Sequence, residues 1–309
     1  MRFAIIGCGS IGQRHTHNLV DLEQEVFIFD RDYDKMRDIC TFNGFVKPFD
    51  PLNKALKFDA YIICTPPEYH TIWAKYAIES NSHVFIEKPI SDKRDVSYVA
   101  QANERGLKIW VGYQLRFHSK LCALRNQIVK GELGDIKHIR AIFGQNLKTW
   151  HPYEDYRNLY TTKCGIILDA SHEIDYVLAL APGEVEYLRC TAGRLGDLEM
   201  DPGAEDSADI SMIVRRKNNT KYTASIHVDC IYPGYVRKCE VIGSKDSAEW
   251  VYNSDKIMEA PEDLYKKEMI KFMECIANPA KKPVVTAVQA VKVLEIALTA
   301  KECAKWVGI

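Results

Sequence analysis

Hydrophobic and polar positions in the first third of the chain alternate between short apolar runs and segments of helical periodicity. The apolar runs predict strands at 2–6, 25–30, 60–64, 83–87 and 108–113. The segments between them predict helices at 11–22, 31–42, 68–81 and 92–106. Strands separated by helices of this length favour right-handed crossovers and a parallel sheet covered on both faces. The pattern therefore predicts a doubly wound α/β domain over residues 1–117.

The pattern changes after residue 117. Helices are predicted at 118–131 and at about 166–180, with a strand-like run at 136–147 between them. From 184 to 252, long runs alternate apolar and polar residues, which is typical of an antiparallel sheet with one wet face. Two helices, at about 262–277 and 285–307, close the chain. We expect residues 118–309 to form a second, α+β domain, with the helix at 285–307 packing back toward the region between the domains.

Composition excludes several classes of protein. The chain has 309 residues, long enough for two packed domains, and its formal net charge is -1 with no basic stripe of the kind that nucleic acid requires. The longest apolar stretches, such as 60–64 and 165–168, fall far short of the ~18 residues that span a bilayer. The N-terminal apolar run soon meets glycines and offers no cleavage site, so we expect a cytoplasmic protein without a secretory signal.

The 10 cysteines are spread evenly along the chain. They form no C-x-x-C pair and no Cys/His cluster of the kind that zinc sites use, so no metal site is expected. An even number would allow five disulfides, but several cysteines lie inside predicted strands, and a chain of this size does not need disulfides for stability. We expect reduced, mostly buried thiols.

Residues 7–12 read GCGSIG, a G-x-G-x-x-G motif that follows a predicted strand and opens a helix. In that context Gly7 permits a tight turn, Gly9 lets the backbone approach a pyrophosphate, and Gly12 allows close helix–strand packing. Asp30 ends the second strand, where a carboxylate binds the adenosine ribose and repels a 2′-phosphate. NAD is therefore favoured over NADP, although Arg31 could stack on adenine or tolerate that phosphate. The alternative is a glycine turn that packs the helix without a ligand.

Two further motifs follow strands of the same sheet. Thr65, Pro66 and His70 come after the strand at 60–64, and Glu87-Lys88-Pro89 follows the next strand. Ligands of open α/β sheets bind at this carboxyl edge. A single lysine after a strand is more often a solvated surface group, but two motifs at the edge that carries the glycine loop favour a functional role.

The chain resembles the Gfo/Idh/MocA oxidoreductases, the family of glucose-fructose oxidoreductase and inositol dehydrogenase. The matching segments are GCGSIG at 7–12, TPPEYH at 65–70, EKP at 87–89, GYQLRFH at 112–118, WHPYEDYR at 150–157 and CGIILDASHEIDY at 164–176. The resemblance implies a Rossmann domain, then a domain built on a large open, mostly antiparallel sheet, and assembly as a homodimer or homotetramer. It also implies a nicotinamide cofactor held by Gly7, Gly9, Ser10, Ile11, Gly12, Asp30, Arg31, Thr65, Pro66, His70, Glu87, Lys88 and Gln114.

The resemblance further implies the catalytic residues. Lys88 would lie near the reacting carbon, where its charge stabilises a developing alkoxide, and His172 would take the proton of the substrate hydroxyl. Asp169, His172 and Asp175 recur every three residues, so one helix brings them toward one face, where a carboxylate can orient the imidazole. Many members place this aspartate four residues before the histidine, so either Asp169 or Asp175 could be the partner here. Without the motif, a satisfied core histidine or a polar stripe would explain the same residues.

The aromatic segment at 150–157 resembles the part of the family that lies over the sugar. Sugar CH faces pack on rings while the hydroxyls need donors and acceptors. The substrate-binding residues implied are Arg116, Trp150, His151, Tyr156, Arg157 and His172. The aromatic residues could instead hold the two domains together by packing, and Arg116 and Arg157 could form salt bridges between the domains.

Together these features predict an NAD-dependent dehydrogenase acting on a secondary hydroxyl of a sugar, polyol or nucleotide sugar, or on the corresponding ketone. The resemblance of the stretch from 150 to 176 favours a nucleotide sugar or another modified sugar of surface-polysaccharide synthesis. Three alternatives have the same fold. They are a biliverdin reductase-like enzyme with a non-sugar substrate, an enzyme that oxidises and reduces a tightly bound cofactor in a redox cycle, and a non-catalytic regulator that binds NAD(H).

Overall fold

The computed structural model describes residues 1–53, 55–150, 152, 156–161, 164–252 and 263–308. The chain forms two compact units, each built from two stretches of sequence. Unit 1 joins Met1–Gln114 to Asp263–Val291, and unit 2 joins Leu115–Glu262 to Lys292–Ile309. A compact unit need not fold alone, so the predicted domains at 1–117 and 118–309 stay a prediction.

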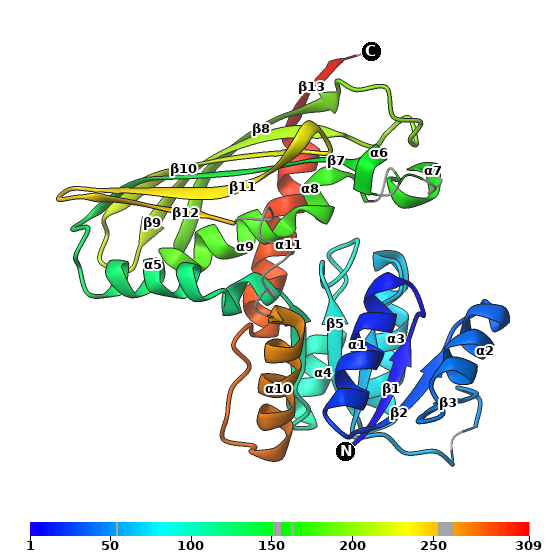
Figure 1. The fold of residues 1–309 in the computed structure, drawn as a ribbon. Coiled ribbons are helices and arrows are strands. Elements are labelled where there is room, and N and C mark those ends of the chain that lie inside the picture. The colour runs from blue at the N-terminus through cyan, green and yellow to red at the C-terminus, as the bar shows by residue number, and fades with distance from the viewer. Residues whose placement is uncertain (54, 151, 153–155, 162–163, 253–262, 309) are drawn as a thin grey trace. The chain divides into compact units, whose positions relative to one another are not determined.

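Unit 1 is built on a parallel sheet of six strands in the order β3-β2-β1-β4-β5-β6 (Figure 1). The strands are β1 Arg2–Ile6, β2 Glu25–Phe29, β3 Val46–Pro48, β4 Ala60–Ile63, β5 His83–Glu87 and β6 Ile109–Gly112. The helices are α1 Ser10–Asp21, α2 Tyr33–Phe42, η1 Pro67–Tyr69, α3 His70–Glu79, α4 Tyr98–Glu104 and α10 Leu264–Ala277. Every residue of β4 and β6 is buried, as a sheet covered on both faces requires. The predicted doubly wound fold is confirmed.

The connections of unit 1 determine where a ligand can bind. Helix α1 packs against α10, and α3 packs against α4, β4 and β5. Right-handed crossovers place α1 and α2 on one face of the sheet and α3 and α4 on the other. Because the strand order reverses between β1 and β4, the loops after these two strands open at one edge.

Two elements of unit 1 differ from the sequence prediction. The edge strand β3 pairs with β2 over only three residues, too few to leave a hydrophobic pattern. The segment at 92–106 is helical only over Tyr98–Glu104, because Asp95 accepts the N–H of Ser97 in a turn that precedes the helix.

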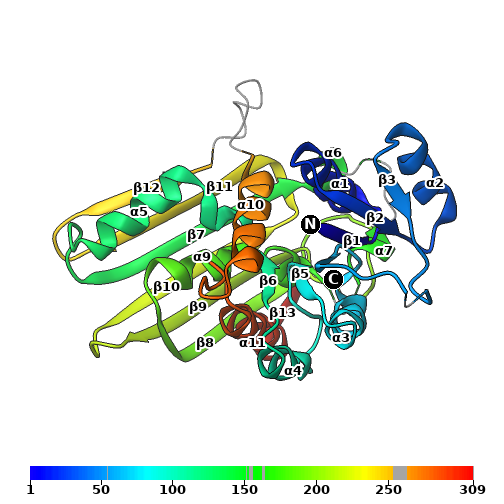
Figure 2. The ribbon, with the colours of Figure 1, turned by 90° about the horizontal axis from the view of Figure 1, so that it is seen from below.

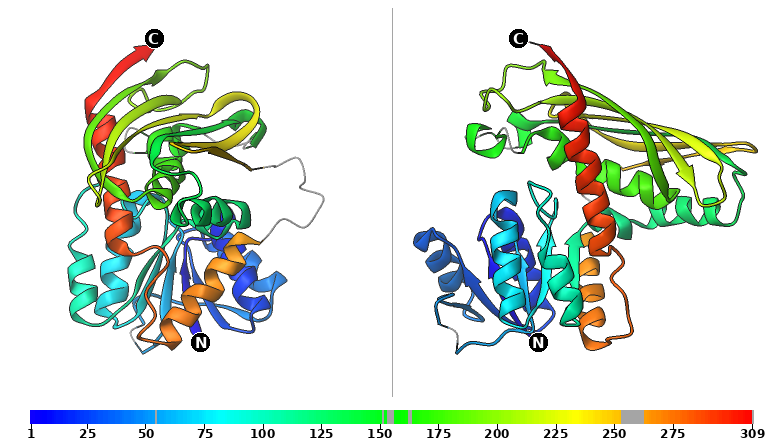
Figure 3. Two further views of the ribbon diagram at one scale, coloured as in Figure 1. Left: turned by 90° about the vertical axis from the view of Figure 1, so that its left-hand side faces the viewer. Right: turned by 180° about the vertical axis from the view of Figure 1, so that it is seen from behind.

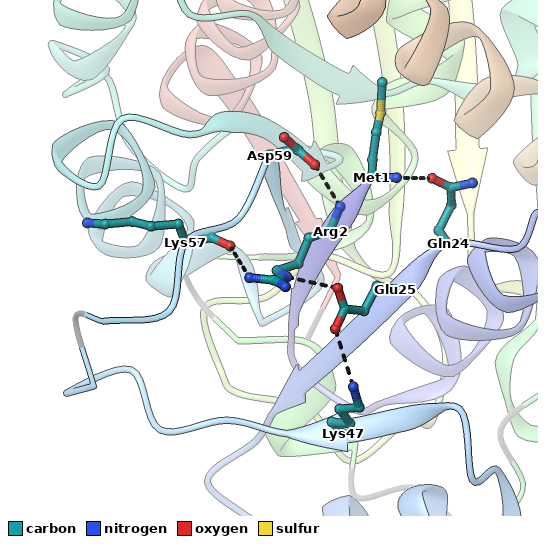
Figure 4. A network of polar contacts seen from close by, with 7 residues as sticks. All are labelled: Met1, Arg2, Gln24, Glu25, Lys47, Lys57 and Asp59. Atoms are coloured by element: carbon teal, nitrogen blue, oxygen red, sulfur yellow. Dashed lines mark hydrogen bonds and ion pairs between the residues drawn. The ribbon is translucent and has the colours of Figure 1, made fainter.

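The amino edge of the same sheet carries a network of exposed polar contacts (Figure 4). Glu25 accepts hydrogen bonds from Arg2 Nε at 2.9 Å and from Lys47 Nζ at 3.3 Å, and Asp59 accepts the Arg2 backbone N–H at 2.7 Å. The two cations lower the pKa of Glu25, mainly through the hydrogen bond from Arg2. Solvent-exposed pairs contribute little to stability. Ligands of open α/β sheets bind at the opposite, carboxyl edge, so the amino edge is not a candidate site.

Unit 2 is built on a mixed sheet of seven strands in the order β12-β11-β7-β10-β9-β8-β13. The strands are β7 Ile136–Asn146, β8 Gly183–Arg194, β9 Ser207–Arg216, β10 Lys221–Asp229, β11 Ile231–Gly243, β12 Ser247–Val251 and β13 Ala304–Gly308. Only β7 with β10 and β8 with β13 run parallel among the described pairs, so the predicted mostly antiparallel sheet is confirmed.

The helices of unit 2 are α5 Ser119–Val129, α6 Leu147–Trp150, α7 Tyr156–Leu159, α8 Ile166–Asp169 and α9 Ser171–Leu180; η2 Gln114–Phe117 and α11 Ala287–Cys303 cross the division between the units. Figure 2 shows α5 and α9 lying across the sheet, and α9 contacts β7 and β10. All residues of α9 are buried, which places this helix in the core of unit 2.

The helix predicted at 285–307 is wrong at its C-terminal end. Helix α11 ends at Cys303, and Ala304–Gly308 forms β13, parallel to β8 (Figure 3). Trp306 and Val307 continue the apolar pattern of the helix, but Trp and Val also favour strands, and the backbone of β8 supplies the hydrogen-bond partners. An available sheet edge overrides the helical pattern here.

The helix predicted at 166–180 is also interrupted. Ala170, with φ −87° and ψ 28°, separates α8 from α9. Asp169 and His172 therefore belong to different helices, and the three-residue spacing does not place them on one continuous face.

The structure adds three general observations. All ten cysteines are free thiols, five of them buried. Within the described residues, no three His, Cys, Asp or Glu side chains are grouped to hold a metal ion. No helix in the described ranges is long and apolar enough to cross a membrane.

Candidate active site

The glycine loop after β1 is closed by backbone contacts that leave no room for side chains. Gly7 has φ +96° and donates its N–H to the carbonyl oxygen of Phe29 at 2.9 Å. A Cβ on Gly7 would lie 2.8 Å from the Cys64 carbonyl oxygen, and one on Gly12 would lie 1.9 Å from that of Gly7. Gly7 therefore brings the loop against the end of β4, and Gly12 brings α1 against the loop.

Gly9, in contrast to Gly7 and Gly12, has open space where a side chain would lie. A Cβ there would meet nothing within 4 Å, and its φ of −68° and ψ of −175° suit any residue. Gly9 is the N-cap of α1, whose first residues are Ser10 and Ile11, and no side chain caps this helix. Uncapped helix N-termini present backbone N–H groups and partial positive charge to anions. The open space before Gly9 thus has the geometry that a pyrophosphate requires.

The Asp30 carboxylate braces this loop. Its Oδ2 accepts the N–H of Cys8 at 2.6 Å, and its Oδ1 accepts the N–H of Asp32 at 2.8 Å. Each carboxylate oxygen retains a further lone pair, so Asp30 can also accept a ribose hydroxyl. Burial and the Asp30 charge raise the pKa of the Cys8 thiol to about 12, which keeps it protonated beside the loop. Arg31 is exposed.

The loop after β4 meets the glycine loop at the same edge. Thr65 Oγ1 is buried and has no hydrogen-bond partner among the described residues, which suits a contact with a bound molecule. Pro66 is exposed. His70 is fully buried, and each ring nitrogen lies 2.8 Å from a carbonyl oxygen, Nδ1 from that of Pro89 and Nε2 from that of Thr65. Burial lowers the pKa of His70, and the two carbonyl contacts oppose that shift.

The EKP motif follows β5. Glu87 turns its carboxylate into the protein, where Oε1 lies 2.7 Å from His15 Nε2 and Oε2 accepts the Lys88 N–H at 3.3 Å. A Cβ on Gly112 would lie 3.0 Å from the Glu87 carboxyl atoms, so the carboxylate fills the space that Gly112 leaves. Lys88 itself is half-buried.

Gln114 follows β6 at the same edge. Its Nε2 donates to the hydroxyl of Tyr265 at 3.0 Å, and its buried Oε1 has no hydrogen-bond partner within the described chain. The glycine loop, Asp30, the segment from Thr65 to His70, the EKP motif and Gln114 are thus all parts of unit 1.

His172, by contrast, belongs to unit 2, where it is buried in the first turn of α9. Two carboxylates that follow it in the same helix form buried ion pairs. Asp175 accepts a bidentate pair of hydrogen bonds from Arg116 at 2.6 and 2.7 Å, and Glu173 accepts from Arg237 Nε at 2.8 Å. Burial raises the pKa of Asp175, which the Arg116 charge opposes. These pairs fix the helix that carries His172.

Asp169 has a different partner. The Tyr160 hydroxyl donates to its Oδ2 at 2.6 Å, and burial together with the Asp169 charge raises the pKa of Tyr160 well above its usual value. Gly165 is the N-cap of helix α8, which carries Asp169. A Cβ on Gly165 would lie 2.4 Å from the carboxyl of Glu205, whose oxygens accept the Ile167 N–H and two contacts from Lys301.

The segment at 150–157 is described only in part. Trp150 ends α6, Tyr156 and Arg157 begin α7, and His151 lies outside the described residues. Arg157 is exposed and forms an ion pair with Glu199 at 3.0 Å. Substrate binding by these residues and by Arg116 stays a prediction, as do the cofactor and catalytic assignments.

Sequence reasoning missed several buried partners in these sites. His15, Tyr265, Glu173 and Arg237 were not singled out. A weak signal existed for His15, because it lies three residues after Gly12 and therefore on the helix face that packs on the sheet.

Comparison with known proteins identifies the family. The family described as "Oxidoreductase family, NAD-binding Rossmann fold" matches residues 1–113, and the "GFO/IDH/MocA C-terminal domain" matches residues 122–249. The chain therefore belongs to the Gfo/Idh/MocA oxidoreductases, as the sequence motifs predict. It is an oxidoreductase of a family that binds NAD through a Rossmann fold.

Individual relatives agree with this assignment. The chain is 25% identical over 308 residues to the uncharacterized oxidoreductase YrbE of Bacillus subtilis (strain 168), covering 90% of this chain and 87% of that protein. It is 26% identical over 254 residues to myo-inositol 2-dehydrogenase of Thermotoga maritima, covering 79% and 73%. The crystal structure of a probable dehydrogenase from Thermotoga maritima shares the fold, with a TM-score of 0.81, 22% identity and coverage of 98% and 96%.

Proposed function

We propose that the protein transfers a hydride between NAD and a secondary hydroxyl of a sugar or polyol, or the corresponding ketone. The observation that carries the proposal is the open glycine loop braced by Asp30, in a chain that also retains Lys88 and His172 in the family motifs. The relative from Thermotoga maritima is a dehydrogenase of myo-inositol by name, which supports a polyol or sugar as substrate.

The residues of unit 1 fit a nicotinamide dinucleotide. Gly9 leaves space for the pyrophosphate at the uncapped start of α1, and Thr65 Oγ1 and Gln114 Oε1 are buried polar atoms that a bound molecule can satisfy. Asp30 would accept the adenosine ribose hydroxyls and repel a 2′-phosphate, which supports NAD over NADP. When bound, the nicotinamide supplies the acceptor or donor of the hydride.

Lys88 and His172 would carry out the proton and charge chemistry of the chain itself. Lys88 would stabilise the negative charge that develops on the substrate oxygen. His172 would remove the proton of the hydroxyl during oxidation and return it during reduction. The buried pairs that Arg116 and Arg237 make with α9 would hold this imidazole in place.

The test is turnover of NAD+ with a panel of inositols, sugars and nucleotide sugars, followed as NADH absorbance. Lys88→Met and His172→Asn should each lower kcat by ~100-fold or more, because each removes a group that acts in the transition state. The matched controls are Lys130→Met and His17→Asn, which change exposed side chains. Wild-type turnover in Lys88→Met would refute the assignment.

Mass spectrometry of small molecules released from the purified protein tests the cofactor independently. Release of NAD(H) supports the proposal, and release of NADP(H) would show that Asp30 and Arg31 do not select against the phosphate. Homodimer or homotetramer assembly, a nucleotide-sugar substrate and a cytoplasmic location stay predictions.

A further inference from the structure

The backbone around Lys88 is contacted by two buried histidines from different helices. His15 from α1 contacts the side chain of the preceding residue, Glu87, and His70 from α3 contacts the carbonyl of the following residue, Pro89. Both imidazoles are fully buried. Because α1 and α3 cover opposite faces of the sheet, the two rings reach the Lys88 segment from opposite sides.

His15 acts on Lys88 through one carboxylate. Its Nε2 lies 2.7 Å from Glu87 Oε1, while Oε2 of the same group accepts the Lys88 backbone N–H. His15 Nδ1 is buried without a hydrogen-bond partner in the described part of the chain. A buried N–H donor left unpaired is costly, so the geometry favours the ring that carries its hydrogen on Nε2 and donates it to Glu87.

The surroundings of this pair restrict it to one arrangement. The His15 ring packs edge-on against Phe85 at 5.1 Å and Tyr265 at 5.8 Å between centroids. Gly112 leaves the space that the Glu87 carboxylate occupies. A carboxylate held in this way fixes the direction of the Lys88 peptide group.

His70 restrains the other side of Lys88. Its Nδ1 faces the Pro89 carbonyl oxygen and its Nε2 faces that of Thr65, both at 2.8 Å. Both carbonyl oxygens can only accept, so a neutral ring donates to one of them, and a hydrogen bond to Pro89 requires the ring hydrogen on Nδ1.

We propose that His15 and His70 are positioning residues that hold Lys88 in its reactive placement, one through Glu87 and the other through Pro89. The proposal rests on the proposed function of Lys88. It assigns to His70 a role in orienting the backbone, and it assigns a role to His15, which the sequence motifs alone do not reveal.

A crossed pair of amide substitutions tests the geometry. A glutamine places its amide near the position of histidine Nε2, whereas the shorter asparagine places it near Nδ1. At position 15 the Nε2 contact is the one that reaches Glu87, so His15→Gln should retain more activity than His15→Asn. At position 70 the Nδ1 contact reaches Pro89, so His70→Asn should retain more than His70→Gln. His17→Asn and His17→Gln, at an exposed position of the same helix, are the matched controls.

Two readouts separate positioning from simple damage to the fold. The first is kcat for myo-inositol with NAD+, or for whichever substrate of the panel turns over, compared with the Kd of NADH measured by fluorescence. The unfavourable amides should lower kcat by ~10-fold or more, because small displacements of a catalytic group have large effects. At position 15, which is not among the implied cofactor-binding residues, the Kd should stay nearly unchanged. The second is the rate at which sulfo-NHS-acetate acetylates Lys88, measured by mass spectrometry relative to the exposed Lys130.

The labelling readout does not require that Lys88 be catalytic. In the unfavourable variants the Lys88 rate should rise toward that of Lys130, and in the favourable variants it should stay near wild type. Equal rates and equal kcat for both amides at a position would overturn the proposal for that histidine. If Lys88→Met keeps full turnover while labelling still follows the crossed pattern, the proposed function fails and the positioning stands.

Discussion

Gly9 and Gly12 belong to one motif, yet the structure predicts opposite consequences for replacing each with alanine. At Gly12 the new Cβ would lie 1.9 Å from the Gly7 carbonyl oxygen, far inside the 3.0 Å that real Cβ contacts respect. At Gly9 the new Cβ would meet no atom within 4 Å, and the backbone angles suit alanine. Gly12→Ala should therefore damage the fold, and Gly9→Ala should damage only ligand binding.

The magnitudes follow from these contacts. Moving α1 or the loop by more than an ångström costs ~1–3 kcal/mol or more by overpacking, against ~1 kcal/mol gained from the better helix propensity of alanine. We expect Gly12→Ala to lower the melting temperature by several degrees. At Gly9, the loss of chain entropy in the unfolded state and the poorer N-cap of alanine about cancel. A methyl group in the open space should instead weaken NADH binding by ~10-fold or more, equivalent to ~1.4 kcal/mol.

The assay is thermal unfolding followed by circular dichroism, with the Kd of NADH measured by fluorescence at 25 °C. Wild-type affinity in Gly9→Ala would show that no pyrophosphate approaches this loop. An unchanged melting temperature in Gly12→Ala would show that the packing of α1 on Gly7 is less tight than the structure indicates. Gly44→Ala, where a Cβ also meets nothing within 4 Å, is the control for changing a glycine at an open position.

Three other expected outcomes concern charges. Hydrogen bonds to Asp209 and Asp229 raise the pKa of His227 from 6.5 to about 9. The contribution of these contacts to stability is therefore full below pH 6.5 and is lost as the pH rises through 9. Screening of this 37% exposed ring leaves ~1 kcal/mol, so His227→Gln should lower the urea midpoint at pH 6 but not at pH 10. Asp175→Ala removes the bidentate carboxylate partner of Arg116, a largely buried arginine, and should cost ~3 kcal/mol in urea unfolding, whereas Asp197→Ala, in an exposed ion pair, should cost almost nothing. Asp30→Asn should raise the ratio of kcat/KM for NADP+ to that for NAD+ by ~10-fold, because one repulsive charge is removed; an unchanged ratio would contradict its role.

The hydrophobic pattern of the sequence is sufficient to predict the strands in which nearly all residues are buried. The strands ending at Ile6, Ile63 and Glu87 were predicted because parallel strands covered on both faces need continuous apolar runs. The glycine motif is also predictable from the sequence, because the spacing of its glycines reflects backbone contacts within one turn.

The remaining features depend on partners distant in sequence. The break at Ala170 separates two helices whose combined pattern is continuous, and β13 forms because the edge of β8 is available. The pairing of Asp175 with Arg116 joins residues 59 positions apart, and no periodicity in a single sequence encodes such a pair. Side-chain partners therefore had to come from the structure even where the motifs had identified the residues.

In each unit, the carboxylate of a glutamate occupies space that is open only because a glycine distant in sequence has no side chain. The Glu87 carboxylate lies where a Cβ of Gly112 would crowd it, and the Glu205 carboxylate lies where a Cβ of Gly165 would overlap it. Each glutamate in turn makes contacts that hold a candidate catalytic segment, Glu87 at Lys88 and Glu205 at the start of α8. In related chains these positions should change together: an alanine at either glycine calls for a shorter residue in place of the glutamate. Such paired replacements would mark relatives in which the Lys88 peptide or helix α8 is held by other means.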